Sequence, residues 1–147
     1  MPDRNFAVVA LSNQGPDSIL FNKEIINYSL NNYLGVTYED PEPVPFNANF
    51  AAEIIGAYEN EVMTLFISVK ENIIQLHVII KPEILAASDK ELPPDHLPFI
   101  FGMVPGKKDE YIITSGAFKG QRGFLSRNEN NAVVGIDLAG RLFKRLV

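Results

Sequence analysis

The chain has 147 residues, of which 46% are hydrophobic, and a formal net charge of −5. This length suits one ordinary domain or two small ones, and the hydrophobic content can form a buried core, which argues against wholesale disorder. The sequence has no cysteine, which excludes a disulfide scaffold and a thiolate metal site. No apolar run approaches the ~20 residues of a membrane helix, so we expect a cytoplasmic protein without a membrane partner.

The charge is distributed unevenly along the chain. Residues 1–105 carry 14 acidic and 5 basic residues, a net of −9, whereas residues 106–147 carry 4 acidic and 8 basic residues, a net of +4. Such an asymmetry is typical of an acidic body joined to a basic contact module. It also arises by chance in a window of this size, and the sequence leaves both interpretations open.

The N-terminal elements begin with a β-rich run over 5–11, followed by a turn signal. Apolar residues at helical spacing then predict a helix from Asp17 to Leu34, and Gly35 follows where a left-handed C-cap is favoured. Residues 37–46 contain three prolines, which remove backbone donors and disfavour helix, so this segment is expected to be an extended connector.

Three further runs, at 51–59, 61–69 and 72–80, are separated by turns short enough only for hairpins. They predict an antiparallel meander. The second and third runs are nearly continuous in apolar residues, which indicates a sheet covered on both faces, one of them by the long helix. A short helical turn is expected around 84–87.

Five short strands with tight turns are predicted in the last fifty-odd residues, at 97–103, 110–116, 122–127, 131–138 and 141–147. This pattern is typical of a small SH3-like or OB-like barrel. The expected fold class is therefore α+β. Residues 1–95 would form an antiparallel sheet with one long helix, and residues 96–147 would form a five-stranded SH3-like barrel.

The segment 110–146 resembles the KOW motif of the NusG transcription-elongation factor family, a motif also found in a ribosomal large-subunit protein. The later part of that family's module is similar to Val133–Leu138, to Gly140 with Arg141, and to Leu142–Leu146. The residues that fill the motif itself are Ile113, Gly116, Phe118, Lys119, Gly120, Gly123 and Phe124.

The resemblance implies a barrel whose loops contact RNA, the ribosome or a protein partner, including one associated with RNA polymerase. It implies a role in gene expression, such as transcription elongation or antitermination. The first two thirds of the chain do not match the polymerase-binding domain of that family, so polymerase binding is not carried over.

The chemistry of the loop agrees with such a contact. Lys119 and Arg122 flank Gly120, where cations and backbone N–H groups can meet phosphate oxygens, and Arg127 and Arg141 can extend that surface. Phe118 either stacks on a base or protein groove, or plugs one end of the barrel. The cations are otherwise an ordinary solvated face. Phe124 is expected in the core, and Gly116 and Gly123 at strand corners.

The pattern does not favour an enzyme. His77 and His96 are the only histidines, and neither has a Ser or Thr two positions on, as a His-x-Thr phosphoesterase motif requires. We expect no catalytic residue, cofactor, metal or small-molecule substrate. An alternative is an acidic regulator, similar to an inhibitor or immunity protein, that docks a basic partner. Its acidic residues form a solvated rim or the docking face: Glu39, Asp40, Glu42, Glu59 and Glu61.

Overall fold

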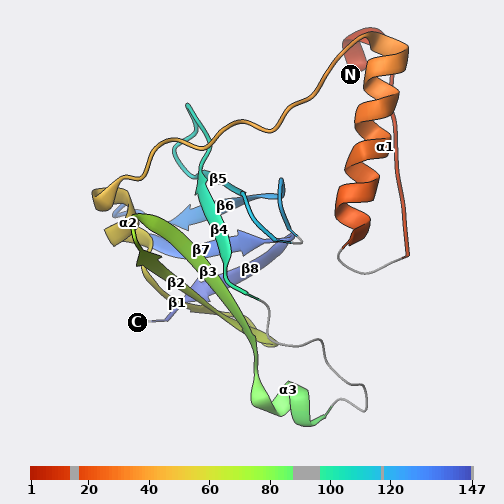
Figure 1. Cartoon of the computed structure of the whole chain (residues 1–147). Helices are drawn as coiled ribbons and strands as arrows, with labels where there is room; N and C mark the ends of the chain where they lie inside the picture. Colours follow the sequence, from red (N-terminus) through yellow and green to blue (C-terminus); the bar gives the residue numbers. More distant parts are fainter. Residues whose placement is uncertain (14–16, 88–96, 117, 147) are drawn as a thin grey trace.

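The computed structural model describes residues 1–13, 17–87, 97–116 and 118–146 (Figure 1). Its centre is one closed barrel of eight antiparallel strands arranged in chain order, with the last strand paired to the first. This is the up-and-down topology, in which every strand has a neighbour on both sides. The strands are β1 Gly56–Glu59, β2 Met63–Lys70, β3 Ile73–Ile80, β4 Phe99–Met103, β5 Glu110–Ile113, β6 Arg122–Arg127, β7 Val133–Leu138 and β8 Arg141–Arg145.

This barrel shows that the expected fold class is wrong. The strands assigned to a separate N-terminal sheet, β1–β3, and those assigned to a five-stranded barrel, β4–β8, belong to the same closed sheet. Two pairings join the sets: Leu76 of β3 lies opposite Phe99 of β4, and Tyr58 of β1 lies opposite Arg145 of β8. The physical reason is that a three-stranded meander would leave two unpaired edges, and closure satisfies both.

Most of the individual strands are confirmed, but the run 51–59 is strand only in its second half. Its first half belongs to the helix α2, Ala48–Ile54. The side chain of Asn47 caps this helix, because its Oδ1 accepts a hydrogen bond from the Phe50 N–H at 3.1 Å. Helical spacing then places Ala51 and Ile54 together in the barrel core. The short helix α3, Pro82–Ala86, lies close to the expected helical turn.

The interior of the barrel is filled by side chains, as expected for eight strands. Its largest fully buried residues include Tyr58, Tyr111 and Phe143. The Tyr111 hydroxyl donates a hydrogen bond to the Asp137 carbonyl at 2.5 Å. The Tyr111 side chain can reach this carbonyl because residue 123 is a glycine, since a Cβ there would lie 2.4 Å from the Tyr111 hydroxyl oxygen. Gly123 is therefore required for a close approach inside the barrel.

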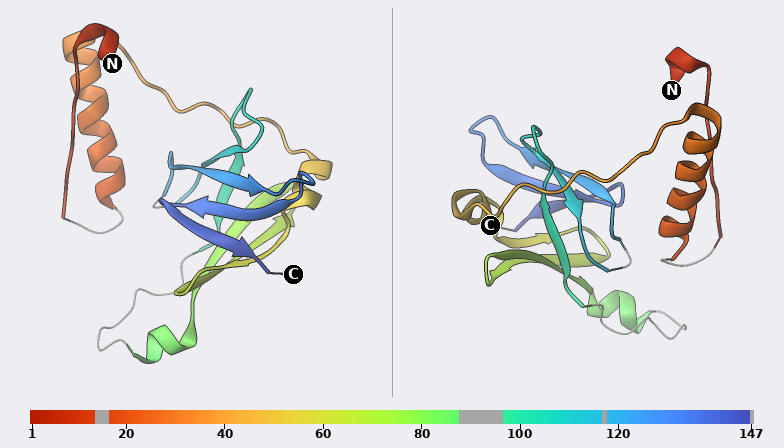
Figure 2. Two further views of the ribbon diagram at one scale, coloured as in Figure 1. Left: turned by 180° about the vertical axis from the view of Figure 1, so that it is seen from behind. Right: turned by 45° about the horizontal axis from the view of Figure 1, so that its top comes forward.

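The helix α1, Asp17–Leu34, is confirmed to its last residue. It ends at Gly35, which has φ +65° and whose N–H donates to the Asn31 carbonyl at 2.9 Å, the hydrogen bond of an αL C-cap. The expectation that this helix covers a sheet face is wrong. It stands beside the barrel, joined to it by the long connector, and residues 5–13 run along it (Figures 1 and 2).

The buried Tyr111 predicts a specific pH dependence of stability. Burial, with a smaller contribution from the charge of Asp137, raises the pKa of Tyr111 above its ordinary value of 10.0. The stability that this neutral hydroxyl contributes is therefore fully present below about pH 10 and lost as the pH rises through the folded-state pKa. We expect Tyr111→Phe to cost about 1 kcal/mol at neutral pH and to flatten the fall in unfolding free energy above about pH 10.

Urea denaturation at a series of pH values checks this prediction. Tyr28→Phe, at an exposed position on α1, is the matched control and should leave the profile unchanged. An equally steep alkaline fall in the Tyr111→Phe variant would contradict the assignment.

Candidate functional site

The wall of the barrel is incomplete between β3 and β4. These strands pair only where Gln75 lies opposite Ile100 and Leu76 lies opposite Phe99, and beyond this point they diverge. The connector enters here, and the Val44 N–H donates to the Met103 carbonyl of β4 at 2.9 Å. The connector therefore takes the place of β3 along the second half of β4.

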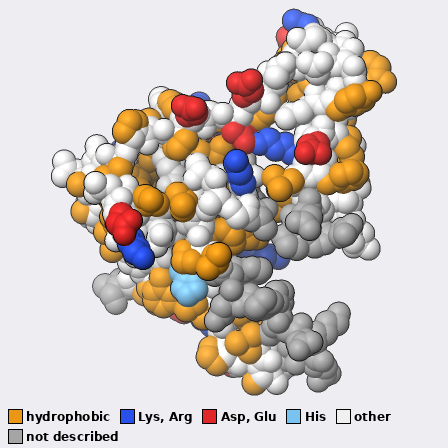
Figure 3. Space-filling view, viewed as in Figure 1, with side chains coloured by type: hydrophobic (Ala, Val, Ile, Leu, Met, Phe, Trp, Pro, Cys, Tyr) orange, Lys and Arg blue, Asp and Glu red, His pale blue; other side chains and the backbone are white. Residues whose placement is uncertain are grey.

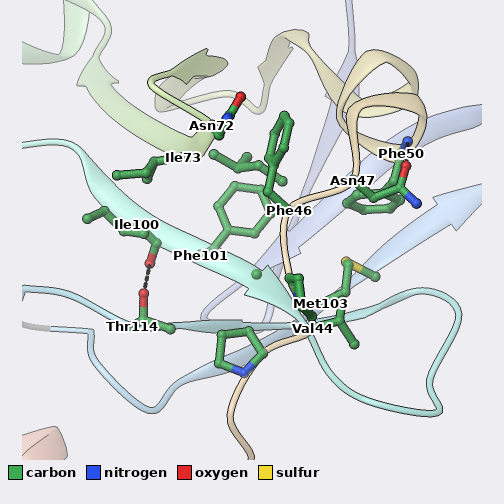
Figure 4. A pocket seen from close by; sticks show the side chains of 14 residues that line it. Val44, Phe46, Asn47, Phe50, Asn72, Ile73, Ile100, Phe101, Met103 and Thr114 are labelled. Atoms are coloured by element: carbon green, nitrogen blue, oxygen red, sulfur yellow. Dashed lines mark hydrogen bonds between the residues drawn. The ribbon is translucent and has the colours of Figure 1, made fainter.

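A cavity of about 330 Å³ lies where the strands diverge (Figure 4). This volume is at the lower end of the range for small-molecule sites, which are mostly apolar with a few polar groups. Among the described residues, none of those that line the cavity is charged. Its principal apolar residues are Phe46, Phe50, Ile73, Ile74, Ile100, Phe101 and Met103, and its polar side chains are Asn47, Asn72 and Thr114.

The cavity has an inner and an outer wall. The inner wall is part of the barrel core, through buried residues such as Ile74 and Phe101. The outer wall comes from the connector and α2, whose half-buried Phe46 and Phe50 pack against that core. In Figure 4 the rings of Phe46 and Phe101 lie at the centre of the site. A molecule held here would therefore contact core side chains without passing through the closed part of the barrel.

Two of the three polar side chains at the cavity already have hydrogen-bond partners. The Thr114 hydroxyl donates to the Ile100 carbonyl at 3.2 Å, and the Asn47 side chain caps α2. Asn72 lies in the turn between β2 and β3 with a left-handed backbone, φ +61°. The surface offered to a ligand is therefore apolar, with Asn72 as a polar group on one side.

The connector can lie against β4 because residue 102 is a glycine. A Cβ at Gly102 would lie 2.6 Å from the Pro43 Cβ. We expect Gly102→Ala to displace the connector and to lower the unfolding free energy by about 2 kcal/mol, measured by chemical denaturation.

A second variant keeps this prediction specific. Pro43→Gly removes the atom that the new methyl would meet, so Gly102→Ala should cost much less in the Pro43→Gly background. Equal costs in the two backgrounds would show that the contact between Pro43 and Gly102 does not hold the connector in place.

The predicted contact loop lies elsewhere on the barrel, before and within β6. Phe118 is half-buried and meets the Phe99 ring edge-on, with centroids 5.0 Å apart, so it packs against the core. Gly116 and Gly120 adopt left-handed φ values of +71° and +85° in the turn. Placing Phe124 in the core is wrong, because it is 55% exposed. Along β6 its neighbours Gly123 and Leu125 face inward, so Phe124 faces out.

Two of the four predicted contact cations are engaged within the molecule. Arg122 pairs with Glu110 at 2.8 Å and also donates to the Tyr38 hydroxyl at 2.8 Å. The hydrogen bond to Glu110 raises the pKa of Arg122. Arg127 pairs with Asp109 at 2.7 Å and with Glu53 at 2.9 Å. These guanidinium groups therefore have less capacity for an external phosphate than free side chains would have.

The other two predicted cations are exposed. Within the described part of the chain, neither Lys119 nor Arg141 forms an ion pair, and they lie on different elements, the turn before β6 and the start of β8. On the face shown in Figure 3, basic and acidic side chains are interspersed. Contact with RNA or a partner through this loop stays a prediction.

The remaining candidate residues do not form a catalytic centre in the described structure. His77 is half-buried on β3, and His96 lies outside the described residues. No group of three His, Asp or Glu residues that could hold a metal ion occurs among the described residues. In the acidic rim, Asp40 pairs with Lys23, and Glu59 pairs with Lys81 at 2.8 Å. Docking of a basic partner on this rim also stays a prediction.

Sequence reasoning missed the residues of the cavity. Asn47 was a usable signal, because an asparagine followed by Phe50, Ala51 and Ile54 is typical of an N-cap before an amphipathic turn. That signal predicts α2 but not the cavity. The cavity depends on the point at which β3 and β4 stop pairing, and no local pattern specifies that point.

Comparisons with known proteins add little to this geometry. No protein-family model matches the chain, and no curated protein matches it. Two solved structures are similar, "Crystal structure of SurE with D-Leu" at 15% identity and "Crystal structure of SurE" at 16% identity, each with a TM-score of 0.46. The alignments cover 86% and 88% of this chain but 27% of each SurE chain. A likeness at this level supports no conclusion about the activity of this protein.

The described residues include no helix that is both long and apolar enough to span a membrane.

Proposed function

We propose that the protein is a non-enzymatic binding module that holds a small apolar molecule in the cavity between β3 and β4. The observation that carries this proposal is the divergence of the two strands after Gln75 and Ile100, which leaves a cavity of about 330 Å³ against the barrel core. A concave site lined by apolar and aromatic side chains with a few polar groups is typical of small-molecule binding.

The lining determines the chemical class of the ligand. Aromatic and aliphatic side chains from β3, β4, the connector and α2 favour an uncharged chain or ring, such as a medium-length acyl group. Burial of apolar surface contributes about 25 cal/mol for each Å² removed from water. A charged group inside the cavity would lose its hydration without gaining a partner, so a polar end of the ligand should remain near Asn72 and the solvent.

This proposal does not depend on the KOW resemblance. The role in gene expression that the resemblance implies would use Lys119 and its neighbours, on a different part of the barrel. Binding in the cavity and binding through the loop at Lys119 can therefore be tested separately.

A matched pair of variants on β3 tests the cavity. Ile73 lines it and is 38% exposed, whereas Ile79 lies on the same strand away from it and is 37% exposed. We expect the unchanged chain to enhance the fluorescence of anilinonaphthalene sulfonate and decanoate to displace the dye. Ile73→Glu should weaken both interactions at least ~10-fold, because it places a carboxylate at the apolar rim.

The control is Ile79→Glu, which adds the same charge to an equally exposed position and should leave both affinities unchanged. Far-UV circular dichroism confirms that both variants are folded. Equal binding by the two variants, or failure of the unchanged chain to bind either probe, would contradict the proposal.

A further inference from the structure

The N-terminal segment 6–11 carries unused backbone hydrogen-bonding capacity from residue 7 onward. It is extended and lies along α1, on the side away from the barrel (Figures 1 and 2). Within the described part of the chain, residues 7–13 make no backbone hydrogen bond. Extended backbone of this kind is a template for pairing with another strand.

The side chains of this segment alternate in burial. Phe6, Val8 and Ala10 are half-buried, and the Phe6 ring lies 5.9 Å from the Tyr33 ring of α1. The intervening side chains point away from the helix, and Val9 and Leu11 are 79% and 91% exposed. A strand that is apolar on both faces is typical of a sheet that is covered on both sides.

The helix α1 also has two apolar faces. Ile19, Ile26 and Leu30 face the barrel, around a space lined by Gly120 and Arg122. On a helical projection the opposite face carries Phe21, Ile25 and Tyr28, spaced at i, i+4 and i+7. Phe21 and Tyr28 are 56% and 72% exposed. A helix that is hydrophobic on opposite sides is usually buried on both.

The width of α1 and the spacing of β-strands indicate how many strands the helix can cover. A helix with its side chains is about 10 Å wide, and neighbouring strands lie about 4.8 Å apart, so a helix covers about two strands. Here α1 has only the single strand segment 6–11 beneath it. At least one more strand is needed beside that segment.

We infer that residues 6–11, with α1, dock onto the edge of a β-sheet in a partner domain. Segment 6–11 adds a strand to that edge, α1 covers one face of the extended sheet, and the partner buries Val9 and Leu11 on the other face. The main-chain hydrogen bonds provide the affinity, and the alternating apolar side chains provide the register.

A second copy of this chain is a poorer occupant. Each strand of its barrel has a neighbour on both sides, and among the described residues the stretches of β3 that do not pair with β4 are each shorter than segment 6–11. Two N-terminal segments paired with each other would form only a two-stranded ribbon, covered on one face by the two α1 helices. Such a ribbon would also leave Val9 and Leu11 exposed.

Photo-cross-linking tests the occupant. The full chain carries benzoylphenylalanine at Val9 or, as a control, at Val62, which is exposed in the turn between β1 and β2. It is irradiated in an extract of the organism that encodes it. We expect a single adduct from position 9, none of the same mass from position 62, and a cross-linked peptide that belongs to an edge strand of the captured protein's sheet. The captured protein is then expressed separately for a binding assay and for hydrogen exchange.

If segment 6–11 binds through backbone hydrogen bonds, removal of its N–H donors should weaken binding, whereas binding through side chains alone would not depend on these donors. The N–H groups of Ala7 and Ala10 point to opposite edges of the segment, because successive residues alternate. Ala7→Pro and Ala10→Pro remove these donors without removing a large side chain. At least one variant should lose binding to the captured protein, and the amides of residues 7–11 should be protected at least ~10-fold on binding in the unchanged chain.

Several results would overturn the inference. They are adducts only between two copies of the chain, adducts that map to a helix or loop of the partner, no adduct at position 9, or full binding by both proline variants. Segment 6–11 does not belong to the barrel sheet, so the circular dichroism of the barrel should be the same in all variants.

Discussion

The closure of β1 onto β8 is the constraint on which the rest of the structure depends. Only two residue pairs join these strands, and the Arg145 guanidinium reinforces the seam. It donates to the carbonyls of Glu53 and Ile55, at 2.7 Å each, and lies 5.7 Å from the centre of the Tyr58 ring. A cation at the last carbonyls of α2 also complements the helix dipole. One side chain thus joins β8 to the helix that leads into β1.

The gap in the barrel wall lies away from this seam, between β3 and β4. The connector compensates there, through the hydrogen bond from Val44 to Met103 and through the rings of Phe46 and Phe50. This compensation is partial, since a ladder of backbone hydrogen bonds is replaced by one hydrogen bond and by side chains packed against the core. The cavity that we propose as a binding site is the space that remains.

Local structure was largely predictable from the sequence, whereas the closure was not. The helix ending at Gly35 and the C-terminal strands follow from spacing and turn residues. The pairing of Tyr58 with Arg145 joins residues far apart in the sequence, and no turn or periodicity signals it. The sequence also did not indicate that Arg122 and Arg127 form ion pairs. Their carboxylate partners, Glu53, Asp109 and Glu110, approach them only in the folded barrel.

Cross-strand nuclear Overhauser contacts in the intact chain test the account most directly. One closed barrel with an incomplete wall predicts backbone contacts between Tyr58 and Arg145 and between Leu76 and Phe99, without a continuation of the second ladder to Ile74 and Phe101. Absence of the contact between Tyr58 and Arg145 would show that the barrel is open. A ladder continuing through Ile74 and Phe101 would show that the wall is complete and that the binding cavity does not exist.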